Sequence, residues 1–170
     1  MKLTKLAAYG VGTLAILAAA TQALPRHITV ERTATIEAAP AAVIAMAASN
    51  EGYQRFNPYI DFDPELRLEM FGPASGVGSG FTFDGKDGTG QQVVAAVADD
   101  RVTFDLDLGP MGQPVQAISA VPAGNGAQVT WTMDMDLGLN PVARVMGLFM
   151  DGMVGPSFEQ GLANIADVTA

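Results

Sequence analysis

The side chains able to do acid–base, nucleophilic or metal chemistry are few in this sequence and lie far apart. His27 is the single histidine, and it precedes the first expected strand, where a catalytic base or metal ligand would lack neighbours. The absence of cysteine removes thiolate metal sites, disulfides and a cysteine nucleophile together. Ser75, Ser79 and Ser119 have no histidine partner, so a serine nucleophile is unsupported. The sequence therefore predicts no catalytic residue and no metal site.

Carboxylates gather in two places. Asp61, Asp63 and Glu65 occupy one loop, and Asp134 and Asp136 share one side of an expected strand. Acid–base work requires a sheltered site that shifts the pKa values of the carboxyl groups, and the spacing matches no calcium-binding loop. We therefore interpret both groups as solvated surface.

The glycine-rich run 76–80, Gly-Val-Gly-Ser-Gly, superficially resembles a nucleotide-binding loop. It lacks a third glycine at the required spacing, and a strand rather than a helix is expected after it. Dinucleotide binding is therefore not expected, and we expect no cofactor.

Apolar side chains dominate the composition instead. Hydrophobic residues make up 49% of the 170 residues and charged residues only 16%, which indicates one domain with an enclosed or membrane-inserted apolar part. The net charge of −9 would repel a polyanion. Neither nucleic acid nor anionic lipid headgroups are therefore expected partners.

Methionine is frequent, and five of the nine methionines fall on faces expected to point inward: Met133, Met135, Met146, Met150 and Met153. Unbranched thioethers suit a surface that adapts to variable apolar ligands. The same side chains could simply fill a core. Ligand contact and core packing both stay open for each of them.

The elements that would position these residues are mostly strands. Residues 28–37 alternate as a first strand, and Pro40 opens an alanine-rich helix that ends at Ala48. Six further alternating runs follow, separated by tight turns: 66–71, 80–84, 89–98, 101–108, 114–121 and 128–136. Such spacing predicts an antiparallel meander.

The closing segment, 140–166, has helical periodicity. Asn140 is expected to cap its first turn. Gly152, Gly155 and Pro156 predict a kink or a break in the middle of this helix.

Residues 1–24 read as a signal peptide or a membrane anchor. Lys2 and Lys5 precede the apolar stretch 6–20, and small residues follow it, which is the layout of a secretory signal. A spanning helix over 6–24 would reach the required length of about 20 residues only by including several polar ones. Both alternatives stay open. Both send residues 26–170 across the membrane, either anchored at the cell envelope or released to the periplasm or the medium.

Short stretches of local sequence support one family resemblance. They are 36–40 (Ile-Glu-Ala-Ala-Pro), 53–58 (Tyr-Gln-Arg-Phe-Asn-Pro), Gly72-Pro73 with 76–78, 128–131 (Gln-Val-Thr-Trp), and 153–155 with Phe158-Glu159 and Gly161-Leu162. In this order, and with this order of elements, the chain resembles the SRPBCC or START-like helix-grip superfamily, and within it the bacterial polyketide cyclase-like branch. The resemblance covers residues 28–165. It departs at Phe56 and Tyr59, where relatives often carry tryptophan.

The resemblance implies an α+β helix-grip fold for residues 26–170. In this fold a curved antiparallel sheet of six or seven strands wraps around a long C-terminal helix, here preceded by an N-terminal apolar helix. The resemblance also implies a cavity between sheet and helix for a lipid, sterol or polyketide-like molecule. We expect ligand contacts from Phe56, Tyr59, Phe81, Phe83, Phe104, Trp131, Met133, Met135, Met146, Phe149, Met150, Met153 and Phe158.

Binding or transfer of a small apolar molecule is the preferred function, because the expected cavity wall lacks acid–base pairs. A cyclase or dehydratase would instead use polar groups at the cavity mouth, for which Tyr53, Arg55, Tyr59 and Arg144 are the candidates. A third alternative is a scaffold whose cavity is filled by its own side chains. The oligomeric state and the identity of the ligand stay open.

Overall fold

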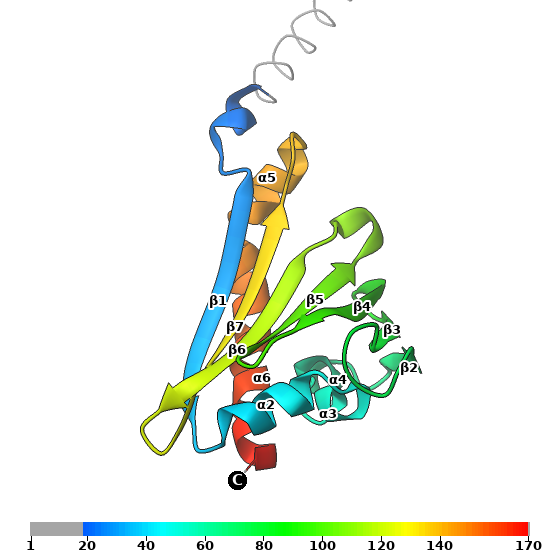
Figure 1. Ribbon diagram of the computed structural model, residues 1–170. Helices are drawn as coiled ribbons and strands as arrows, with labels where there is room; N and C mark the ends of the chain where they lie inside the picture. The colour runs from blue at the N-terminus through cyan, green and yellow to red at the C-terminus, as the bar shows by residue number, and fades with distance from the viewer. Residues whose placement is uncertain (1–18, 170) are drawn as a thin grey trace, which may run out of the picture.

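The computed structural model describes residues 19–169, and its main feature is a curved antiparallel sheet of seven strands in the order β1-β7-β6-β5-β4-β3-β2 (Figure 1). Strands β2 to β7 form a meander, because each pairs with the next one along the chain. The first strand lies at the opposite edge, beside β7. The strands are β1 (His27–Ile36), β2 (Arg67–Phe71), β3 (Gly80–Gly85), β4 (Gly88–Val97), β5 (Arg101–Asp107), β6 (Val115–Ala123) and β7 (Gly126–Asp136).

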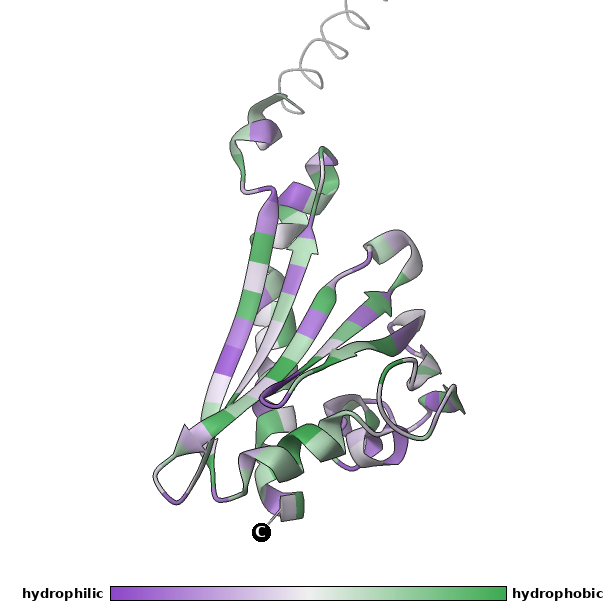
Figure 2. Ribbon diagram, viewed as in Figure 1, coloured by the Kyte–Doolittle hydropathy of each residue, from purple (hydrophilic) through white to green (hydrophobic). Residues whose placement is uncertain are grey.

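Alternation along the strands gives the sheet an inner and an outer face. In β7, Trp131 and Met133 are buried while Asp134 is exposed, and bands of opposite hydropathy alternate along the strands (Figure 2). Register places Trp131 opposite Arg32 of β1 and Ile118 of β6. Directly opposed residues share a face, so we call the side that bears Trp131 the inner face.

Three short helices connect β1 to β2 and lie at the C-terminal end of the molecule (Figure 1). They are α2 (Pro40–Ala47), α3 (Asn50–Gln54) and α4 (Pro58–Phe62). Ser49 caps α3 and Asn57 caps α4, each by accepting a hydrogen bond from a backbone N–H of the first turn. Helix α2 packs against β5, β6 and β7.

Two helices follow β7, namely α5 (Pro141–Gly147) and α6 (Met150–Thr169). Asn140 caps α5 as expected, since its Oδ1 accepts hydrogen bonds from the N–H groups of Val142 and Ala143. Helix α6 packs along β1 on the inner face (Figure 1). The predicted α+β helix-grip class is therefore confirmed.

The predicted break in the middle of the C-terminal helix is wrong. Helix α6 continues through Gly152, Gly155 and Pro156, and the helical path is interrupted earlier, at Leu148 and Phe149. Packing against β1 offsets the helix-interior cost of about 1 kcal/mol for each glycine and about 3 kcal/mol for proline. Gly155 has a packing reason, because a Cβ there would overlap the guanidinium of Arg32.

The N-terminal apolar helix lies mostly outside the described residues, since 1–18 are not among them. Where the description begins, the 3-10 turn η1 (Thr21–Ala23) contacts α5. Among residues 19–169, no helix has the length and apolar character needed to cross a bilayer. Signal peptide and anchor both stay predictions, as does the domain boundary near residue 26.

Candidate functional site

Aromatic rings fill the interior between the sheet and the helices at the C-terminal end of the molecule. Trp131 of β7 stacks on Phe158 of α6, with ring centroids 4.9 Å apart and planes at 10°. Tyr53 of α3 meets the edge of Trp131 at 6.1 Å. Each such pair adds about 0.5–1.5 kcal/mol beyond area burial. The cluster, which we call the aromatic core, consists of Tyr53, Phe56, Phe81, Phe104, Trp131 and Phe158, all buried.

Buried polar groups of the aromatic core have partners on the sheet. The indole Nε1 of Trp131 donates to Oε1 of Gln116 at 3.0 Å. The hydroxyl of Tyr53 donates to Oε1 of Gln92 at 3.3 Å. Burial raises the pKa of Tyr53 well above its ordinary value. The phenol therefore stays protonated near neutral pH and serves as a hydrogen-bond donor.

A cavity of only about 10 Å³ lies beside this core. It is bordered by Tyr53, Gln92 and the buried hydroxyl of Ser79, for which the described residues provide no hydrogen-bond partner. A drug-sized ligand needs about 300 Å³ or more. At this end of the interior, the protein's own side chains thus occupy the space where the resemblance implies a cavity.

The other end of the inner face, toward α5, carries methionines, and we call it the methionine end. Met133 and Met135 of β7 are buried there, and Met150 of α6 is half-buried against the core. Helix α5 packs on this end of the sheet, because a Cβ on Gly147 would lie 2.5 Å from Cδ1 of Leu137. Flexible thioethers therefore replace rigid rings along the interior.

Six large apolar side chains of the α5–α6 region are exposed. We call three of them the stripe: Met146, Phe149 and Met153, which are 43%, 59% and 59% exposed. Met146 belongs to α5, Phe149 lies in the interruption, and Met153 lies in the first turn of α6; the N–H of Phe149 donates to the carbonyl of Met146, and the N–H of Met153 donates to that of Phe149. Met153 is about three turns from Asn164, so these two residues share a face of α6. Asn164 donates to Oδ2 of Asp61 in α4 at 3.1 Å. The helix face that α4 covers farther along is therefore uncovered at Met153.

The residues predicted to contact a ligand fall into three groups. Seven are buried: Phe56, Phe81, Phe104, Trp131, Met133, Met135 and Phe158. Phe83 and Met150 are half-buried. Met146, Phe149 and Met153 are exposed, although the helical periodicity placed them inward, and Tyr59, which the resemblance placed at the ligand, is exposed too. The structure brings the aromatic residues together as a core, and ligand contact stays a prediction for all of them.

Arg32 is an inner-face cation that the sequence analysis missed. Its Nη1 lies 2.8 Å from Oδ1 of Asp151 and its Nε lies 2.7 Å from Oε1 of Glu159, both on α6. The hydrogen bond from Arg32 lowers the pKa of Asp151. The sequence did indicate that Arg32 faces inward, because Arg32 lies two residues after Val30 and the strand alternates. Nothing in the sequence indicated its acidic partners, which lie far away in the chain.

The enzyme alternative requires Arg144 to reach a cavity mouth, but the structure places its side chain elsewhere. It is buried, and its guanidinium donates to the backbone carbonyls of Gly138, Gln22 and Leu24 at 2.9, 2.8 and 3.1 Å. Arg144 thus holds the first described residues of the chain against α5. Of the other candidates, Arg55 is exposed and donates to a backbone carbonyl near the C-terminus.

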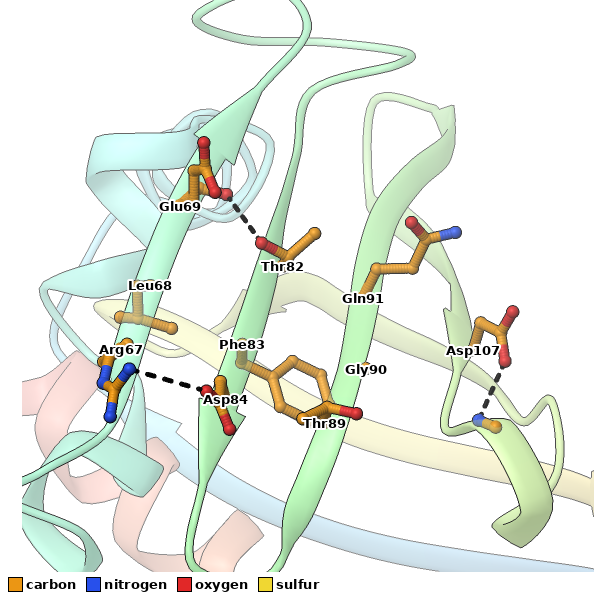
Figure 3. A pocket seen from close by; sticks show the side chains of 11 residues that line it. Arg67, Leu68, Glu69, Thr82, Phe83, Asp84, Thr89, Gly90, Gln91 and Asp107 are labelled. Carbon is orange, nitrogen blue, oxygen red and sulfur yellow. Dashed lines mark hydrogen bonds and ion pairs between the residues drawn. The ribbon is translucent and has the colours of Figure 1, made fainter.

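A much larger space, about 840 Å³, lies over strands β2 to β5 (Figure 3). Glu69, Thr82, Gln91 and Asp107 pair directly across these strands on the outer face, and their side chains line the space. Of the predicted ligand contacts, only Phe83 borders it. Its lining includes the charged side chains of Arg67, Glu69, Asp84 and Asp107 beside Leu68 and Phe83, and these charges favour water over an apolar molecule. The methionine end is therefore the better candidate site.

A curved seven-stranded antiparallel sheet around a C-terminal helix defines a helix-grip protein. The sequence pattern of the family described as "Polyketide cyclase / dehydrase and lipid transport" matches residues 27–169. The chain belongs to this family, which confirms the resemblance seen in the sequence. Membership supports the binding of a hydrophobic ligand in general.

Solved structures share the fold at low sequence identity. Truncated norcoclaurine synthase from Thalictrum flavum has a TM-score of 0.66 at 14% identity, over 84% of this chain and 92% of that chain. Protein CV1439 from Chromobacterium violaceum has a TM-score of 0.59 at 13% sequence identity, over 85% of this chain and 98% of that chain. The di-domain ARO/CYC StfQ of the steffimycin biosynthetic pathway has a TM-score of 0.61 at 12% sequence identity, over 84% of this chain and 50% of that chain. No curated protein matches the sequence.

Proposed function

We propose that this protein binds a small hydrophobic molecule of the lipid, sterol or polyketide type at the methionine end of its interior, and that it does so at the cell envelope. Family membership supports the hydrophobic ligand. The apolar stretch 6–20, preceded by Lys2 and Lys5, supports the location.

The observation that carries the ligand proposal is the stripe. Met146, Phe149 and Met153 expose apolar surface where α5 meets α6, and Met153 lies on the face of α6 that contacts α4 farther along. Covering an exposed phenylalanine stabilises a complex by about 1.5–3 kcal/mol. An apolar ligand against the stripe would therefore gain binding energy without displacing the aromatic core.

The cyclase-type alternative draws less support from the described interior. The polar side chains beside the aromatic core include Gln92, Gln116 and Tyr53. The two amides do not exchange protons near neutral pH, and the raised pKa of Tyr53 keeps its phenol from acting as a base. We therefore favour binding.

Photocrosslinking of the full-length protein with a diazirine-bearing fatty acid tests the ligand proposal. Crosslinked peptides should contain the stripe or Met133 and Met135. Phe149→Glu should weaken labelling about tenfold, which corresponds to 1.4 kcal/mol, because the ligand would lie against an uncompensated charge. Val121→Glu is the matched control, since Val121 is an exposed apolar residue of β6 away from the stripe. Equal labelling of both variants, or crosslinks confined to other surfaces, would contradict the proposal.

A further inference from the structure

The end of the molecule at which the described chain begins carries four more exposed apolar side chains, which adjoin the stripe because Val142 and Met146 lie one turn apart in α5. Leu139, Val142, Val145 and Leu148 are 75%, 69%, 40% and 57% exposed, and we call these four residues the tip. Leu139 lies in the loop after β7, Val142 and Val145 lie in α5, and Leu148 follows its last residue. Four exposed aliphatic side chains within ten residues exceed the scattered apolar residues of an ordinary surface.

The tip also lacks exposed charge. Between Asp136 and Asp151 the only charged residue is Arg144, and its guanidinium is buried against backbone carbonyls. The chain as a whole has 18 acidic residues, and its charged share is 16%. The acidic surface that would be repelled by lipid headgroups is therefore absent from this stretch.

The first described residues are bonded to the tip. The side-chain amide of Gln22 donates to the carbonyl of Leu139 at 3.2 Å, and Arg144 holds the carbonyls of Gln22 and Leu24. The apolar stretch 6–20 ends two residues before Gln22. Two residues of extended chain span at most about 7 Å. Wherever the apolar stretch lies, its end is therefore beside the tip (Figure 1).

We propose that the tip docks onto a lipid bilayer. Leu139, Val142, Val145 and Leu148 enter the apolar edge of the interface, and Arg144 fixes the angle at which the chain leaves the bilayer. The inference rests on the proposed location of the apolar stretch 6–20 in the membrane, and it does not depend on ligand binding at the stripe.

The bilayer is a better occupant than a second copy of the chain, because only the bilayer also accounts for the adjoining apolar stretch. A partner protein would have to cover the tip and leave room for residues 6–20 beside it. Docking would orient the domain with the β6–β7 turn pointing away from the membrane, since this turn lies at the opposite end from α5 (Figure 1).

Single-site fluorescence on vesicles tests the proposal. The chain has no cysteine, so Leu148→Cys and Asn125→Cys each give one labelling site for nitrobenzoxadiazole; Asn125 is exposed in the β6–β7 turn. The full-length variants are reconstituted in phosphatidylcholine vesicles with nitroxide-bearing acyl chains. The emission of the label on Leu148→Cys should shift to the blue. Its quenching should be at least about twice that of the label on Asn125→Cys, because only the tip reaches the acyl region.

A second pair of variants guards against a label that perturbs the tip. Val142→Asp, added to a chain labelled at Leu139→Cys, should reduce the quenching, whereas Val121→Asp at the other end should not. Docking is overturned if the Leu148 label is quenched no more than the Asn125 label, or if the protein does not associate with the vesicles. A blue-shifted Leu148 label without quenching would show that protein covers the tip, which overturns docking too. Stripe crosslinking by the fatty acid is unaffected by any of these outcomes.

Discussion

At the scale of single residues, the contact between β1 and α6 combines an apolar seam with one charged cluster. Arg32 lies on the inner face, where its neighbours in the strand are apolar, and it reaches Asp151 and Glu159. The acidic partners are largely exposed, so solvent screens the attraction and the gain in stability is small. The contact instead joins one residue of the strand to two residues of α6, and so helps to position the helix along the strand.

This cluster gives a pH-dependent prediction for Asp151→Asn. The folded protein lowers the pKa of Asp151, so the ion pair contributes stability above the unfolded pKa of about 3.9 and loses it as the pH falls through the folded value. The melting temperature of the wild-type protein should therefore exceed that of the variant at neutral pH, and the difference should shrink below about pH 4.

Thermal unfolding followed by the emission of Trp131, the only tryptophan, measures this difference. Asp87→Asn, in the exposed β3–β4 turn, removes one negative charge away from Arg32 and is the matched control. A difference between wild type and Asp151→Asn that stays constant from pH 7 to pH 3, or that the control reproduces, would contradict the assigned ion pair.

At the scale of elements, α6 owes its position to small residues that allow close approach. A Cβ on Gly161 would overlap the ring of Trp131, and a Cβ on Gly155 would overlap Arg32. Gly152 has no atom of another element within 4 Å of such a Cβ. The glycines of one helix therefore have different roles: the rigid ring of Trp131 requires Gly161, a side chain at position 155 would displace the guanidinium of Arg32, and Gly152 is free of such contacts.

Gly161→Ala and Gly152→Ala form a matched pair that tests this difference. Gly161→Ala should destabilise the protein by about 1–3 kcal/mol through overpacking, reduced by an intrinsic helix gain of about 1 kcal/mol. Gly152→Ala should gain up to about 1 kcal/mol, since nothing opposes the helix preference. Denaturant unfolding of both variants measures the free energies. Equal destabilisation would contradict the packing role of Gly161.

At the scale of the whole molecule, the buried aromatic side chains and the exposed apolar side chains gather at opposite ends. The aromatic core lies where α2, α3 and α4 meet the sheet, and the stripe and tip lie at the end where η1 meets α5. The residues that stabilise the fold are thereby separated in space from those proposed to bind the ligand. Substitutions at the exposed stripe should alter ligand binding with little cost in folding, whereas those in the core should unfold the domain.

The proposed location at the envelope predicts the behaviour of a fusion. A reporter enzyme that is active only outside the cytoplasm, joined after Ala170, should be active, because Lys2 and Lys5 stay inside while the rest of the chain crosses. Carbonate-washed membranes should retain the fusion if residues 6–24 are an anchor and release it if they are a cleaved signal. An intact but inactive fusion would contradict export.

Local pattern in the sequence was sufficient to predict the strands and their faces. Val129, Trp131 and Met133 alternate with polar residues, and a period of two places them on one side of a strand whatever the strand pairs with. The cap at Asn140 was equally predictable, because its hydrogen bonds join neighbouring residues. These features depend on residues close together in the chain, and the sequence by itself determined them.

The tertiary structure decided which of these faces are covered. Phe149 and Met153 have the periodicity of buried residues, yet they are exposed because α4 ends before it reaches them. Arg144 and Arg32 have buried or half-buried guanidinium groups, and each has partners that lie more than 110 residues away in the chain. Contacts between segments so distant follow from the paths of the whole chain, since no local preference specifies which surfaces will meet.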